Sequence, residues 1–86
     1  MPYIPQKERE LFDLSIHCLD TTVQTEGQLN YVISRLAINF ARNQGGNYAA
    51  YNKTVGVLES AKLEFYRRHV APYEDKKIKE NGDVPS

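Results

Sequence analysis

Apolar residues recur at intervals of three and four along most of the chain, which is the spacing of one face of an α-helix. The first series follows Pro5, a residue that suits the first turn of a helix, and predicts a helix over residues 6–23. Asp13 is a good N-cap, so a second helical piece starting there is the alternative. The apolar members of the series are Leu11, Phe12, Ile16, Leu19 and Val23.

A second helix is predicted over residues 26–43. Thr25 and Gln28 have the spacing of a capping box, in which each side chain satisfies a free backbone N–H at the start of the helix. The run Asn43-Gln44-Gly45-Gly46 supplies residues that adopt the left-handed backbone needed to end it. The apolar positions between these signals are Leu29, Val32, Ile33, Leu36, Ala37 and Phe40.

A third helix is predicted over residues 48–71, with Asn47 as its N-cap and Pro72 breaking or kinking it. A short helical turn over 73–80, closed by Asn81-Gly82, follows. Because only a Gly-Gly turn separates the second and third helices, they are expected to form a long antiparallel hairpin. The fold class is therefore all-α, in one domain over residues 1–86.

Gly56 lies inside the third predicted helix, where glycine costs about 1 kcal/mol relative to alanine. Such a residue predicts close approach of another backbone. We expect that backbone to belong to a packed helix, and a ligand is the alternative.

The small size of the chain predicts self-association. A chain of 86 residues buries only about 60% of its unfolded surface, and a single cysteine, Cys18, provides no internal disulfide. We expect Cys18 to be buried and the protein to be a homo-oligomer. The apolar residues of Pro2–Pro5 and of the tail 81–84 are expected to pack against the helices or a neighbouring subunit.

The charges cancel overall but are unevenly distributed. Residues 1–28 hold two bases and five acids, whereas residues 29–69 hold six bases and two acids. A net charge of zero argues against binding along extended nucleic acid. The basic centre indicates either an anionic ligand or pairing with the acidic N-terminal segment, and the second is favoured.

No catalytic or metal site is predicted. His17 and Cys18 are neighbours in sequence, so they point in different directions from a helix and form no nucleophile–base pair. The histidines lack a metal-ligand spacing, and Gly45-Gly46 lacks the rest of a phosphate-binding loop. We therefore expect no enzyme activity and no cofactor. With no apolar run long enough for a membrane span or a signal peptide, we also expect an intracellular protein without membrane contact.

The segment EFYRRHVAPYED, residues 64–75, is the candidate binding site. Glu64 and Arg68 have the spacing of a helical ion pair, whereas Arg67 has Leu63 four residues before it and is expected to be unpaired. A guanidinium can hold a phosphate or carboxylate through two hydrogen bonds, beside aromatic walls. The predicted ligand-binding residues are Tyr66, Arg67, Arg68, His69 and Tyr73.

The motifs PYIPQ, QLNYVISRL, VGVLESAKLEFYRRHVAPYED and KENGDV together resemble a family of small proteins of bacteriophages and prophages. The likeness covers nearly the whole chain and implies a cytoplasmic protein of an infected or lysogenic cell. More distantly, Arg67 or Arg68 with Val70, Ala71 and Pro72 is similar to the hairpin of phage proteins that sequester cyclic nucleotides. That likeness implies a role against host defence.

Two functions remain open from the sequence. The first is a binding protein that holds a small anionic ligand, such as a nucleotide, between arginines and tyrosines. The second is a structural or interaction module, in which the same residues join subunits or grip a host protein.

Overall fold

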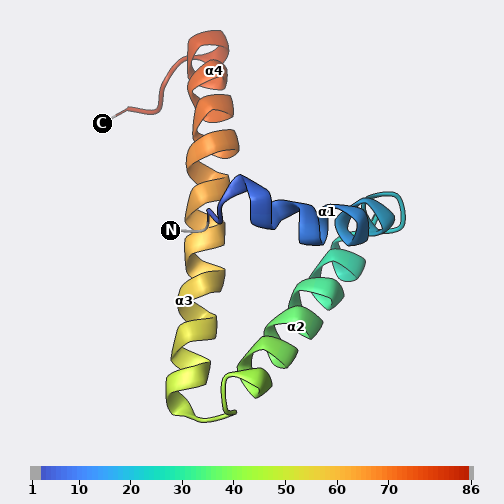
Figure 1. Cartoon of the computed structure of the whole chain (residues 1–86). Helices are drawn as coiled ribbons and strands as arrows, with labels where there is room; N and C mark the ends of the chain where they lie inside the picture. Colours follow the sequence, from blue (N-terminus) through green and yellow to red (C-terminus); the bar gives the residue numbers. More distant parts are fainter. Residues whose placement is uncertain (1–2, 86) are drawn as a thin grey trace. The chain divides into compact units, whose positions relative to one another are not determined.

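The computed structural model describes residues 3–85, and these contain helices and no strand (Figure 1). The helices are α1 (Gln6–Asp20), α2 (Glu26–Asn43) and α3 (Tyr48–Phe65), followed by the π-helical turn η1 (Tyr66–Val70) and α4 (Ala71–Asn81). No loop separates α3, η1 and α4, so they form one helical stretch. The predicted all-α class is confirmed.

Two compact units divide the chain. One covers Tyr3–Thr54 and the other covers residues 55–85, so the boundary falls within α3. The antiparallel packing of α2 against α3 and the single domain over 1–86 stay predictions.

The start and end of α2 are fixed by the chemistry that its sequence predicts. The Thr25 hydroxyl accepts the Gln28 N–H at 3.1 Å, and the Gln28 side chain accepts the Thr25 N–H at 3.1 Å. At the other end the Gly46 N–H donates to the Ala41 carbonyl and the Gly45 N–H to the Arg42 carbonyl. Both glycines have positive φ, which completes a Schellman motif.

The other predicted boundaries are met in part. Asn47 caps α3 by accepting the Ala50 N–H at 3.0 Å, and Gly82 ends α4 with a φ of 86°. Helix α1 ends at Asp20, three residues earlier than predicted, where the Thr22 hydroxyl donates to the Cys18 carbonyl. It is continuous, so the alternative of a restart at Asp13 is wrong.

The predicted break at Pro72 is wrong, while the alternative of a kink stays a prediction. The Ala71 N–H donates to the Tyr66 carbonyl five residues back, so the helix widens to a π turn immediately before the proline. Pro72 has no N–H to donate and lies in the first turn of α4, where a proline is tolerated. The extra residue of the π turn therefore carries the helix through Pro72 (Figure 1).

Very little of the described chain is buried. The buried apolar residues are Ala41 and Ala50, joined by Thr54, whose hydroxyl donates to the Ala50 carbonyl at 2.8 Å. All three lie at or near the Gly45-Gly46 turn. Cys18, expected to be buried, is exposed, because α1 has no buried residue at all.

The chain ends were expected to pack against the helices. Among the described N-terminal residues, the Ile4 carbonyl accepts a hydrogen bond from Arg9 Nε at 3.1 Å, while Pro2 lies outside the described residues. In the tail, Val84 is 79% exposed, so it does not pack on the helical stretch of its own compact unit. Packing of the tail on a neighbouring subunit stays a prediction.

Two glycine substitutions test the local account of the helices. Gly45 has a φ of 115°, so Gly45→Ala should lower the free energy of unfolding by about 1–2 kcal/mol.

Gly56 has a helical backbone, and a Cβ added there would meet no atom within 4 Å. Gly56→Ala should therefore raise the free energy of unfolding by about 1 kcal/mol. Urea denaturation measures both. If Gly56→Ala instead lowers the free energy of unfolding, another backbone does approach Gly56 closely, as the sequence predicts.

Candidate functional site

The candidate site lies on the helical stretch around the π turn η1. Its residues belong to a single compact unit, and they occupy the end of α3, η1 itself and the start of α4. The π turn changes the angular spacing of side chains within it, so the positions expected from a regular α-helix do not apply here.

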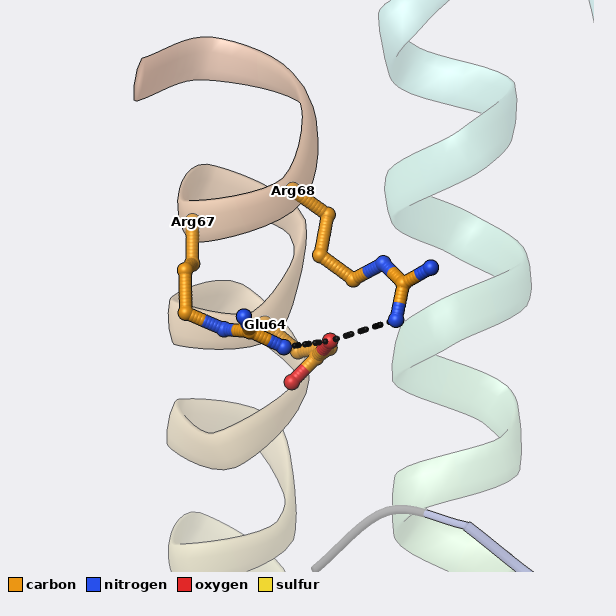
Figure 2. Close-up of polar contacts among 3 residues, drawn as sticks. All are labelled: Glu64, Arg67 and Arg68. Carbon is orange, nitrogen blue, oxygen red and sulfur yellow. Dashed lines mark hydrogen bonds and ion pairs between the residues drawn. The ribbon is translucent and has the colours of Figure 1, made fainter. Parts of the chain in front are cut away.

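Arg67 and Arg68 both turn back toward Glu64 in the preceding helical turn (Figure 2). Arg67 Nη2 lies 2.8 Å from Glu64 Oε1, and Arg68 Nη1 lies 3.7 Å from the same oxygen. The Glu64 side chain is half-buried, whereas both arginines are exposed. One carboxylate therefore offsets part of two positive charges.

The expectation that Arg67 is unpaired is wrong. Its partner stands three residues before it, and residues three apart are neighbours on a helix just as residues four apart are. The predicted pair of Glu64 with Arg68 is present as well, with the longer separation. The sequence therefore contained the signal for both contacts.

Tyr66 makes a contact that spans the π turn. Its hydroxyl donates a hydrogen bond to Glu74 Oε1, eight residues further along. This hydrogen bond, together with the negative charge of Glu74, raises the pKa of the Tyr66 hydroxyl above its ordinary value. No simple helical spacing predicts this pair, because it depends on the π turn between the two residues.

His69 and Tyr73 have neighbours of their own. The His69 ring lies on Phe65, with centroids 5.0 Å apart and an interplanar angle of 37°. The Lys77 ammonium lies 5.5 Å from the centre of the Tyr73 ring, a cation–π contact. The structure thus joins Arg67 with Arg68 through Glu64, and gives the other three predicted residues separate partners.

Neither a metal-ion site nor a membrane-spanning helix is found in the part of the chain that the structure describes. No group of three or more histidine, cysteine or acidic side chains there is arranged to hold a metal ion. None of the helices within residues 3–85 combines the length and apolar character that crossing a membrane requires.

Comparison with known families identifies the family to which the chain belongs. A family model described as a domain of unknown function, DUF6899, matches residues 1–84. The chain belongs to the DUF6899 family. No curated protein matches it, and neither does any solved structure.

Membership of DUF6899 agrees with the small-protein family that the sequence motifs resemble, in that the matched region spans almost the whole chain. All five predicted ligand-binding residues fall within the matched DUF6899 region. The bacteriophage or prophage origin stays a prediction.

Proposed function

We propose that this DUF6899 chain is a non-enzymatic interaction module that works as a homo-oligomer in the cytoplasm. One observation carries the proposal, namely that Ala41 and Ala50 are the buried apolar residues of the described chain. Large apolar side chains on every α-helix are exposed, among them Leu11, Leu36, Val55 and Ile78. Large aliphatic side chains such as these are among the residues most often buried in folded proteins.

Self-association supplies the stabilisation that one copy lacks. Burial of apolar surface is the largest favourable term in folding, and small domains without disulfides or metals obtain it by association. The exposed tyrosines, including Tyr31, Tyr48 and Tyr51, suit an interface because they combine large apolar area with a polar tip.

The proposal predicts the mass of the protein in solution. Light scattering at micromolar chain concentration should return a mass of at least two chains, compared with the 9.9 kDa of one chain. The physical reason is that a second copy can cover large apolar side chains that are exposed in the single chain. A mass of 9.9 kDa across the concentration range would contradict the proposal.

We also propose a second candidate function, the binding of a small anionic ligand at Arg67 and Arg68. The observation that favours it is the pair of guanidinium groups directed at a single carboxylate oxygen of Glu64 (Figure 2). A phosphate or carboxylate is also an anion with oxygen acceptors in a similar hydrogen-bonding geometry, so it can compete with Glu64 for these groups. The likeness to phage proteins that sequester cyclic nucleotides supports a nucleotide as the ligand, and with it a role against host defence.

Paired substitutions at Glu64 and Arg67 test the second candidate. Glu64→Gln removes the internal competitor and should tighten the binding of inorganic phosphate or of a nucleotide, whereas Arg67→Ala should weaken it about tenfold or more. Calorimetry with phosphate and a panel of linear and cyclic nucleotides measures both. The melting temperature should hardly change, because both arginines are exposed and ion pairs at the surface contribute little to stability.

Lys62→Ala is the matched control for this experiment. Lys62 is also an exposed base in an i,i+3 pair, with Glu59, on the same helix. The Lys62→Ala substitution should leave anion binding unchanged. If no anion of the panel binds the parent or Glu64→Gln, the arginines serve only the helix and the second candidate is wrong.

A further inference from the structure

The hydrogen bond between Tyr66 and Glu74 depends on the π turn that separates them. A regular α-helix turns by about 100° per residue, so residues eight positions apart lie about 80° apart around it. The π turn η1 holds one extra residue, because the Ala71 N–H donates to the Tyr66 carbonyl five positions back. Tyr66 and Glu74 are therefore placed like residues seven apart in an α-helix, on one face, and the Tyr66 hydroxyl reaches Glu74 Oε1.

The other contacts described around η1 do not need the extra residue. Glu64 meets its two arginines at spacings of three and four residues, and Phe65 meets His69 at a spacing of four. Residues at these spacings are neighbours in a regular α-helix as well. The Tyr66–Glu74 hydrogen bond is therefore a contact that the helix gains with the extra residue, in the π register, and loses without it, in the α register.

Pro72 can be accommodated in either register. It has no N–H to donate, so one backbone carbonyl lacks its helical donor in both cases. That carbonyl belongs to Arg67, five positions back, in the π register, and to Arg68, four positions back, in the α register. In the α register the proline ring also meets the Arg68 carbonyl, and helices relieve this clash by kinking. A side-chain contact that exists in one register alone can therefore decide between them.

We propose that the Tyr66–Glu74 hydrogen bond is a latch that holds η1 in the π register. Without the latch, the helix returns to the α register as far as Ala71 and kinks at Pro72. The turn then loses its extra residue, so the side chains of α4 rotate by about 100° relative to those of α3. All of these residues belong to one compact unit, and the latch requires neither self-association nor a bound anion.

The register decides which charges of α4 lie in line with the arginines. Two helical turns beyond Arg68, the residue most nearly in line is Lys76 in the π register and Asp75 in the α register. Beyond Arg67 the corresponding residues are Asp75 and Glu74, so an acid lies there in both registers. The latch therefore exchanges an acid for a base on the side of Arg68, which makes the potential around the arginines more positive.

Substitutions on the two sides of the hydrogen bond test the latch in the full chain. Tyr66→Phe removes the donor, and Glu74→Ala removes the acceptor. Each should lower the ratio of π to α register about fivefold or more, because a hydrogen bond to a charged group is among the stronger polar contacts. NMR couplings across hydrogen bonds report the register, since the Ala71 N–H couples to the Tyr66 carbonyl in the π register and to the Arg67 carbonyl in the α register.

Tyr73→Phe and Glu80→Ala are the matched controls. Tyr73 lies in the same helical stretch, and phenylalanine keeps the ring that Lys77 contacts. Glu80 is an acid of α4 whose carboxylate lies 3.2 Å from the Lys77 ammonium, so Glu80→Ala removes the same charge from the same helix as Glu74→Ala does. Both controls should keep the coupling between the Ala71 N–H and the Tyr66 carbonyl at its parental strength.

The double variant Tyr66→Phe/Glu74→Ala separates the hydrogen bond from other effects of each substitution. If both side chains act through one hydrogen bond, the double variant should change the register ratio no further than either single variant does. Additive changes would overturn the latch. A parental coupling between the Ala71 N–H and the Tyr66 carbonyl in both single variants would overturn it too, because Pro72 would then hold the π turn without the hydrogen bond.

Discussion

The burial of apolar side chains is the constraint on which this protein depends. Local signals form its helices, but the described chain buries only two apolar residues, both small and both at or near the Gly45-Gly46 turn. Amphipathic helices of this length gain most of their stability from tertiary packing rather than from intrinsic propensity. The proposed self-association would supply a partner surface for the apolar side chains that α1 and α2 leave exposed.

In the helical stretch around η1, the polar contacts join residues that lie three to eight positions apart in the sequence. Glu64 holds Arg67 and Arg68 from one turn away, and Tyr66 reaches Glu74 across the π turn. Such contacts orient side chains at modest energetic gain. The same arrangement keeps two guanidinium groups beside one another, which is why anion binding remains a reasonable second proposal for this segment.

The sequence predicts the helix boundaries well where the signal is local. The capping box at Thr25 and the turn at Gly45-Gly46 each depend on residues a few positions apart, and the structure confirms them. Pro72 misled the prediction, because a π turn accommodates the missing N–H and a simple rule for proline ignores that option. Cys18 was misplaced because its burial depends on what covers α1, which is not a local property. The Glu64–Arg67 pair could have been predicted from the sequence, because residues three positions apart are neighbours on a helix.

The dependence of unfolding on chain concentration tests the central claim most directly. If folding requires the apolar faces to be covered by another copy, the urea midpoint should rise steadily as the chain concentration is raised from about 1 μM to about 100 μM, by mass action. Loss of helicity and loss of assembled mass should then occur together. A cooperative transition with the same midpoint at both concentrations would contradict the account, because it would show that a single copy folds without a partner.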